Sequence, residues 1–256
     1  MQIRRFFEPS FVPGEGTVTL SEAESQHALR VLRLEPGDRL QLLNGRGGEA
    51  QCRLLAAEDG GRRPKNARVE VLSAKEAARP AFAVTLCVAV PRGKNFDAVL
   101  RMAVELGVAQ IQPLLCRYSV ARPQADSLPG WEAVAVGALK QSGNLWLPQI
   151  LPPRPFMEVR QERCGQPGYF GAVPREGEPS AVSAAAAALG GSSGGVLWIG
   201  PEGGFAPEEE DELRQDGVLP LTVGSWVMRV ETAVPVMLGF LLALREAAGL
   251  ERPEEK

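Results

Sequence analysis

The sequence predicts an α/β protein in two parts, a small β-barrel followed by a parallel-sheet α/β domain. Short strand-like segments separated by turn dipeptides fill the first part, whereas continuous apolar strands alternate with helical segments in the rest. The charge changes at the same place, because residues 1–79 carry 13 Lys and Arg against 11 Asp and Glu and residues 80–256 carry 15 against 20. With 256 residues the chain is long enough for two modest domains, which we expect at 1–75 and 76–250.

Four short strands are predicted in the first part, each bounded by turn dipeptides of the Pro-Gly, Asn-Gly or Gly-Gly kind. Strands at this spacing are typical of a small barrel. A helix is predicted over residues 21–31, with Ser21 as its N-cap and Glu24 completing a capping box. The predicted strands are Thr17–Leu20, Arg39–Leu43, Glu49–Leu55 and Ala67–Leu72.

The second part begins with a continuous apolar run, Ala83–Val90, which is typical of a strand buried on both faces of a parallel sheet. Residues 176–195 are rich in Ala, Gly and Ser and are expected to be a linker or a poor helix. Elsewhere strands and helices alternate. Helices are predicted over 95–106, 131–142, from 207 and over 232–248, and strands over 111–115, 168–173, 196–200 and 219–224.

Several chemical classes are excluded by what the sequence lacks. It contains no GxGxxG after a strand, no P-loop and no GxSxG, so dinucleotide folds, P-loop NTPases and serine hydrolases have no support. With His27 as the only histidine, and cysteines that are never within three residues of one another, no metal site is expected. The cysteines are expected to be buried or incidental thiols in a reducing compartment. They are Cys52, Cys87, Cys116 and Cys164.

Charge and hydropathy limit the possible partners. The net charge of −3 argues against binding nucleic acid through bulk positive charge, without excluding a local basic patch. The longest apolar stretch, Thr232–Leu244, is shorter than the ~18 residues that a membrane-spanning helix needs. The first residues also lack the apolar core of a signal peptide. We therefore expect a cytoplasmic protein with no membrane partner.

A glycine-rich motif, Ile199-Gly-Pro-Glu-Gly-Gly-Phe, follows a predicted strand and precedes a helix. Its glycines allow close backbone approach, and ligands commonly bind at the carboxyl ends of parallel strands. Glu202, Glu208 and Glu209 would repel a phosphate, so a ligand with a cationic centre or a neutral heterocycle fits better. An ordinary tight turn is the alternative explanation.

A second loop, after the strand that ends at Gly224, carries Met228, Arg229 and Glu231 into the last helix. An Arg and a carboxylate at this point can also form an ion pair or a helix cap with no further function. If the two loops follow neighbouring strands, however, they could build a cofactor pocket together.

These motifs in combination closely resemble the RsmE family of 16S rRNA uridine N3-methyltransferases, within the SPOUT superfamily of knotted methyltransferases. The resemblance is strongest in the glycine motif and in Met228-Arg-Val-Glu-Thr-Ala. It extends over nearly the whole chain. Further matching segments are Arg4-Arg-Phe-Phe, His27-Ala-Leu-Arg-Val-Leu-Arg-Leu-Glu-Pro-Gly-Asp, Ala103-Val-Glu-Leu-Gly-Val, Ile111-Gln-Pro-Leu and Gln141-Ser-Gly.

The resemblance implies a PUA-like β-barrel for RNA and a SPOUT domain with a deep trefoil knot, one of the rare exceptions to unknotted chains. It also implies S-adenosylmethionine as cofactor, a homodimer, and 16S rRNA in the small ribosomal subunit as the partner. The implied cofactor-binding residues are Ile199, Gly200, Glu202, Gly203, Gly204, Leu221, Val223, Gly224 and Met228.

The implied reaction moves a methyl group from a sulfonium to uracil N3, which must lose its proton. Arg229 is the candidate for stabilising negative charge on the uracil carbonyl oxygen. Glu231 is expected to orient Arg229 or to assist proton removal, and orientation is the preferred interpretation. Candidate RNA contacts are Arg4, Arg5, Arg30, Arg33 and Lys94, with Arg30 and Arg33 on one face of the predicted helix. His27 is given no catalytic role.

The chain departs from the family pattern at three positions. Lys140 and Asn144 stand where the family usually has Glu and Arg, and Trp226 stands where it usually has Arg. We expect cofactor binding to be retained and RNA binding to be weaker or rearranged. Two alternatives remain: a knotted methyltransferase acting on another RNA, and an RNA-binding or assembly protein that has lost catalysis.

Overall fold

The computed structural model describes residues 4–56, 66–173 and 194–247. Most of the predicted linker at 176–195 lies outside these ranges. The chain divides into two compact units, one of residues 1–79 with 139–147 and the other of residues 80–138 with 148–256. Segment 139–147, the end of a helix and the loop after it, joins the first unit although it is distant in the sequence.

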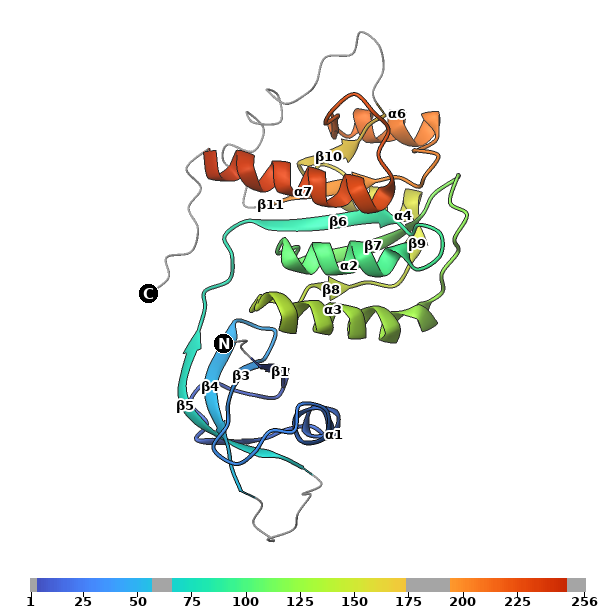
Figure 1. The fold of residues 1–256 in the computed structure, drawn as a ribbon. Coiled ribbons are helices and arrows are strands. Elements are labelled where there is room, and N and C mark those ends of the chain that lie inside the picture. Colours follow the sequence, from blue (N-terminus) through green and yellow to red (C-terminus); the bar gives the residue numbers. More distant parts are fainter. Residues whose placement is uncertain (1–3, 57–65, 174–193, 248–256) are drawn as a thin grey trace. The chain divides into compact units, whose positions relative to one another are not determined.

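The N-terminal unit is built on a curled five-stranded sheet (Figure 1). Its strand order is β1-β3-β4-β5-β2, with β1 and β3 parallel and all other neighbours antiparallel. Closing a barrel requires the two edge strands to pair, and no pairing joins the three-residue edges β1 and β2 here. The predicted barrel is therefore a half-barrel. The strands are β1 (Arg5–Phe7), β2 (Thr17–Thr19), β3 (Arg39–Leu43), β4 (Gly48–Leu54) and β5 (Arg68–Glu76).

The apolar core of this unit lies against one face of the sheet. Phe6, Phe11 and Leu42 are fully buried in it, together with Val69 from the long strand β5. Strand β1 was not predicted, because three residues beside two arginines give no alternating pattern long enough to detect.

The predicted helix over 21–31 begins as α1 (Glu22–Gln26) and continues as a π-helix, η1 (His27–Val31). Ser21 is the N-cap as predicted, because its Oγ accepts a hydrogen bond from the amide of Glu24 at 3.4 Å. The other half of the capping box does not form. The amide of Ser21 donates to Glu8 instead, which leaves the carboxylate of Glu24 for another partner.

Arg33 lies beyond the end of this helix. Its φ is 52°, in the left-handed region, and the π-helix already ends at Val31. The prediction that Arg30 and Arg33 share one helical face is therefore wrong. A π-helix adds an extra residue per turn, so a spacing of three no longer aligns two side chains.

The C-terminal unit has a parallel sheet in the order β12-β10-β11-β6-β7-β8, with β9 also paired to β7 (Figure 1). This confirms the predicted α/β class. The strands are β6 (Ala83–Ala89), β7 (Gln110–Leu115), β8 (Gln149–Ile150), β9 (Arg154–Pro155), β10 (Gly168–Gly171), β11 (Gly194–Ile199) and β12 (Leu219–Leu221).

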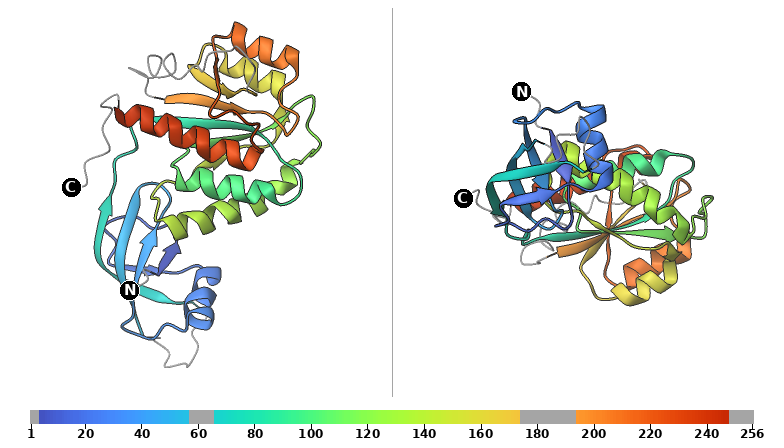
Figure 2. Two further views of the ribbon diagram at one scale, coloured as in Figure 1. Left: turned by 45° about the horizontal axis from the view of Figure 1, so that its top comes forward. Right: turned by 90° about the horizontal axis from the view of Figure 1, so that it is seen from below.

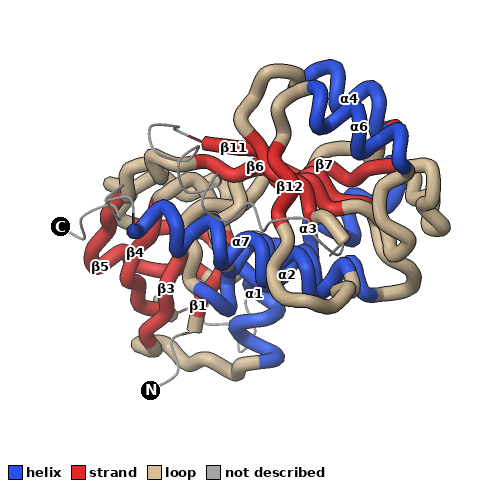
Figure 3. The backbone as a smooth tube through the Cα atoms, turned by 90° about the horizontal axis from the view of Figure 1, so that it is seen from above, coloured by secondary structure: helices blue, strands red, loops and turns tan. Residues whose placement is uncertain are grey.

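Helices cover both faces of this sheet. Figures 2 and 3 show α2, α7 and the first part of α3 on one face and α4 with α6 on the other. On the first face, the rings of Phe96 and Trp131 meet edge to face at 4.7 Å between centroids. The helices are α2 (Asn95–Glu105), α3 (Leu128–Ser142, after the 3₁₀ turn Ala125–Ser127), α4 (Phe156–Arg163), α6 (Pro207–Gln215) and α7 (Val230–Ala247).

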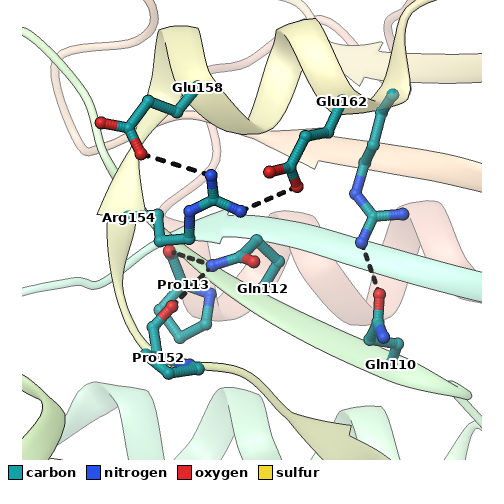
Figure 4. A network of polar contacts seen from close by, with 8 residues as sticks. Gln110, Gln112, Pro113, Pro152, Arg154, Glu158 and Glu162 are labelled. Carbon is teal, nitrogen blue, oxygen red and sulfur yellow. Dashed lines mark hydrogen bonds and ion pairs between the residues drawn. The ribbon is translucent and has the colours of Figure 1, made fainter.

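A polar network fixes the edge of the sheet at β7, β9 and α4 (Figure 4). Gln112 is 1% exposed, and its side-chain amide donates to the carbonyl oxygen of Pro152 at 2.8 Å. The guanidinium of Arg154 bridges Glu158 and Glu162 on α4, at 3.3 and 2.7 Å. This network attaches α4 to the sheet and takes no part in the pocket described below.

Candidate functional site

Four neighbouring strands of the parallel sheet, β12, β10, β11 and β6, end at the same edge. Because parallel strands run in one direction, the loops that follow them gather there, which is the usual ligand position in α/β folds. The loops are residues 222–229, 172–173, 200–206 and 90–94.

The first three of these loops line one pocket. It brings together Ile199, Gly200, Glu202, Gly204, Val223 and Met228 from the predicted cofactor set, whereas Gly203, Leu221 and Gly224 adjoin lining residues in the chain without lining the pocket themselves. Sequence reasoning missed the contribution of β10 and α7. The remaining lining residues are Gly171, Ala172, Val173, Pro201, Thr222, Trp226, Val227, Val230, Ala233 and Met237.

The glycine loop turns tightly before α6. Gly204 has φ 76°, which favours glycine, and its amide donates to the carbonyl oxygen of Pro201 at 2.8 Å. Glu209 caps the helix that follows, because its carboxylate accepts from the amides of Ala206 and Arg117, each at 2.9 Å. This buried carboxylate therefore serves the fold, whereas the loop presents backbone to the pocket.

Glu202 connects the glycine loop to the loop after β6. Glu202 is a lining residue of the pocket, and its carboxylate accepts a hydrogen bond from the amide of Arg92 at 3.0 Å. Residues 90–94 are thereby fixed beside the pocket, with Lys94 exposed at the start of α2.

Arg229 and Glu231 stand at the start of α7, on either side of the lining residue Val230. The carboxylate of Glu231 accepts from the side chain of Asn95 at 3.1 Å. Arg229 is exposed, and its guanidinium makes no hydrogen bond or ion pair with the residues that the structure describes. The expected orientation of Arg229 by Glu231 is therefore not seen, because Glu231 is engaged by α2 instead.

The loop before α7 offers unpaired backbone groups to the pocket. Among the described residues, no hydrogen bond engages the amides of residues 223–228. Unpaired amides at a partly closed site are available donors for a ligand, while Met228, Val230 and Met237 supply apolar surface. The pocket thus combines backbone polarity with apolar walls, which suits a neutral heterocycle joined to an aliphatic chain.

The five candidate RNA contacts fall into two groups. Arg4 pairs with Asp38 at 3.2 Å, and Arg5 donates to Gln41 at 2.9 Å and to the backbone carbonyl of Gln141 at 2.8 Å. Within the described ranges, no side-chain partner is present for the remaining cations. They are Arg30, Arg33 and Lys94.

The cysteines lie apart from this site. Burial raises the pKa of Cys52 and of Cys87 to about 12 and also raises the pKa of Cys116. The exposed Cys164 has its pKa raised by the carboxylate of Asp216, to which its thiol donates at 3.4 Å. In the described part of the chain no group of three His, Cys, Asp or Glu side chains could hold a metal ion, and no helix is long and apolar enough to cross a membrane.

Two domain families match the chain. The RNA methyltransferase domain matches residues 78–242, and the RNA methyltransferase PUA domain matches residues 20–61. A ribosomal RNA small subunit methyltransferase E from Synechocystis is 31% identical over 91% of this chain and 75% of the relative. The protein of the same name from Mycobacterium bovis is 30% identical over 93% of this chain and 90% of the relative.

Solved structures with a similar fold point to the same family as the sequence comparisons. The ribosomal RNA small subunit methyltransferase E of Neisseria gonorrhoeae, bound to S-adenosyl methionine, superposes with a TM-score of 0.79 and 25% identity over 96% of this chain and 98% of that one. A structure from Legionella pneumophila with bound cofactor SAM gives a TM-score of 0.79 and 26% identity, over 96% and 98%. The resemblance drawn from the sequence motifs is confirmed: the chain belongs to the ribosomal RNA small subunit methyltransferase E family of RNA methyltransferases.

Proposed function

We propose that this protein uses S-adenosylmethionine to methylate N3 of a uridine in the 16S rRNA of the small ribosomal subunit. The observation that carries the proposal is the pocket at the ends of β10, β11 and β12, in a chain of this family. The names of its relatives support a small-subunit rRNA substrate, and the motif resemblance supports N3 of uridine. A cytoplasmic location follows from such a substrate.

The residues of the pocket fit the cofactor. The amides of residues 223–228, which bond to no described residue, are available to hydrogen-bond adenine and ribose, and Gly204 lines the pocket without a side chain. Met228 and Met237 are apolar neighbours for the aliphatic part. When bound, the cofactor supplies an electrophilic methyl group on a sulfonium.

The reaction forms a bond between carbon and uracil N3, breaks a carbon–sulfur bond and releases the N3 proton. Arg229 makes no side-chain hydrogen bond or ion pair with the described residues and is next in the chain to two pocket-lining residues, so it would hold the negative charge that develops on a uracil carbonyl oxygen. Glu231, two residues after Arg229 and held by Asn95, is the candidate to accept the proton, directly or through water.

The two domains expected from the sequence divide the work in this proposal. Residues 1–75 form a PUA-like module for RNA, and residues 76–250 carry the methyltransferase. The proposal includes the deep trefoil knot that the resemblance implies; α7 follows the edge strand β12 and packs on β11 and α2 near the middle of the sheet. A homodimer, as the resemblance implies, completes the proposal.

Methyl transfer tests the function directly. Small ribosomal subunits from a strain lacking this protein are incubated with the purified protein and isotope-labelled S-adenosylmethionine, and the rRNA nucleosides are analysed by mass spectrometry. We expect labelled N3-methyluridine. Arg229→Ala is expected to lower kcat by about 100-fold or more with unchanged cofactor affinity in calorimetry, because its role is confined to the transition state. Arg101→Ala, an exposed arginine on α2, is the matched control.

The outcomes separate the alternatives. If calorimetry detects no binding of S-adenosylmethionine to the wild-type protein, the cofactor assignment is wrong. Label in another nucleoside or only in another RNA favours a related methyltransferase. RNA binding without any transfer favours an assembly protein that has lost catalysis.

A further inference from the structure

Trp226 is a large apolar side chain that the protein leaves in solvent. It is 84% exposed and its neighbour Val227 is 67% exposed, whereas Trp131 and Trp198 are 8% and 2% exposed. Large apolar side chains gathered at an exposed position mark binding sites more often than chance, because their hydration is unfavourable. Trp226 also lines the pocket, so the exposed indole stands at its rim.

The surroundings of Trp226 suit a flat, polar ligand. Within the described chain its ring has no aromatic or cationic partner, and the amides of its loop are unpaired. Arg229, three residues further on, has a guanidinium with no hydrogen-bond or ion-pair partner in the part of the chain that the structure describes. An exposed indole that lines the pocket and the cation of Arg229 thus stand three residues apart in one loop.

We propose that Trp226 is a substrate-positioning residue that stacks on the pyrimidine base entering the pocket; the inference rests on the proposed function. A base taken out of an RNA stack loses its aromatic neighbours, and an aromatic side chain at the pocket replaces one of them. Stacking fixes the plane of the base, while Arg229 is placed to meet its edge. Trp226 therefore provides an aromatic stacking surface at a position where the family pattern has a charged Arg.

Kinetics with matched variants test the role. Trp226→Ala is expected to lower kcat/KM for methyl transfer to small ribosomal subunits by about 10- to 100-fold, the range that loss of one base–aromatic stack produces. Trp226→Phe should restore most of the activity, and the Kd of S-adenosylmethionine should be unchanged in both variants. Met157→Ala removes an exposed apolar side chain on α4 that does not line the pocket, and it should leave kcat/KM near the wild-type value. Equal losses in the Ala and Phe variants would overturn stacking.

Fluorescence gives a reading that does not depend on catalysis. Because Trp226 is the most exposed of the tryptophans at 84%, its emission is separable as the difference between wild type and Trp226→Phe. A single-stranded RNA oligonucleotide with one uridine should quench this emission, and the same RNA with an abasic site there should quench it less. Quenching by S-adenosylmethionine alone, or equal quenching by both RNAs, would show that the indole faces something other than the base.

Sedimentation velocity tests the remaining explanation, that a second copy of the chain covers Trp226. If Trp226→Ala converts an oligomer into a monomer, a second copy of the chain covers the indole and the proposal is wrong. Failure of the proposed function would give a different result, because the wild-type protein would then transfer no methyl group. The quenching of Trp226 fluorescence by the uridine RNA, measured as the difference between wild type and Trp226→Phe, would still decide for or against stacking.

Discussion

Among the described residues, the side chain of Asn95 positions the carboxylate of Glu231. Asn95 at the start of α2 donates to it at 3.1 Å, and Arg229 is close in sequence but not paired with it. Asn95→Ala should release the carboxylate, which can then pair with Arg229 and withdraw that cation from the substrate. We expect kcat for methyl transfer to fall about ten-fold, equivalent to about 1.4 kcal/mol, with unchanged affinity for S-adenosylmethionine.

A variant of the same helical turn is the control. Asp97→Asn removes a half-buried carboxylate near Asn95 without touching the bond to Glu231, so kcat should stay near the wild-type value. Asn95→Asp places a second carboxylate against Glu231 and should reduce kcat further while shifting its pH profile. Full activity in Asn95→Ala would show that Glu231 needs no support.

Thiol reactivity should separate the cysteines at residue resolution. Burial raises the pKa of Cys52 and Cys87 to about 12, and that of Cys116 in the same direction, so these thiols should resist iodoacetamide at pH 8 in the native protein. Cys164 is exposed and should be alkylated, more slowly than in the unfolded chain because Asp216 raises its pKa. Peptide mass spectrometry measures both, and modification of Cys87 before unfolding would contradict the structure.

The raised pKa values of Cys52 and Cys87 also determine whether the folded state gains or loses stability as the pH rises. An unfolded thiol ionises near pH 9, whereas the buried thiols of Cys52 and Cys87 stay protonated until about pH 12. The folded state therefore binds more protons in this window, and the stabilisation that is complete below pH 9 declines as the pH rises towards 12.

Individual site residues could be predicted where a motif is contiguous, as in the glycine loop and the loop of Met228. Gly171 and Met237 could not, because their place in the pocket comes from the position of β10 between β11 and β12 and from the packing of α7. The partner of Glu231 was missed for the same reason. Asn95 lies 136 residues away in the chain, and no periodicity records such a contact.

At the scale of elements, the end of α3 is held by a charge pair that explains one departure from the family pattern. Lys140 Nζ lies 2.7 Å from the carboxylate of Glu24 and 5.6 Å from the ring centre of Phe6, and the side chains of the pair are 21% and 12% exposed. Because the pair is partly buried, we expect its contribution to the free energy of unfolding to lie between those of surface and fully buried ion pairs. Lys140→Ala should therefore lower the free energy of unfolding by about 1–3 kcal/mol in urea denaturation.

Charge reversal tests the pair more sharply. Lys140→Glu sets two carboxylates against each other and should destabilise more than Lys140→Ala, and adding Glu24→Lys should recover much of the loss. Arg53→Ala is the control, because Arg53 and Glu70 are 50% and 39% exposed and such pairs contribute about 0–1 kcal/mol. Equal effects of the alanine variants at Lys140 and Arg53 would show that burial adds nothing.

Elements with a clear apolar pattern were predictable, and several short ones without such a pattern were not. Strand β6 and helix α2 follow from a continuous apolar run and from helical spacing of buried residues such as Phe96 and Leu100. Helix α4 buries only Phe156 and Val159 within a charged sequence, so it has no clear apolar stripe. The two-residue strands β8 and β9 exist only because β7 pairs with them. Closure of the N-terminal sheet was wrongly expected because strand spacing does not determine which edges meet.

At the scale of the whole molecule, the net charge of −3 leaves RNA binding to individually placed cations. Of the five candidates, Arg4 and Arg5 already bond within the protein, while Arg30, Arg33 and Lys94 have no side-chain partner among the described residues. The free cations are therefore the ones available to phosphates, and the two engaged arginines should matter for stability instead.

The salt dependence of RNA binding tests this division. Removing one cation that pairs with a phosphate lowers the slope of log K against log salt concentration by about 0.7–0.9. The double variant Arg30→Ala with Arg33→Ala should therefore lower the slope for 16S rRNA by about 1.4–1.8. Lys94→Ala should lower it by about half of that. Arg4→Ala should leave the slope unchanged, because its guanidinium is paired with Asp38. Filter binding over a range of KCl concentrations measures the slopes. A slope that falls with Arg4→Ala and not with the free cations would mean that RNA displaces Asp38 and that Arg30, Arg33 and Lys94 stay in solvent.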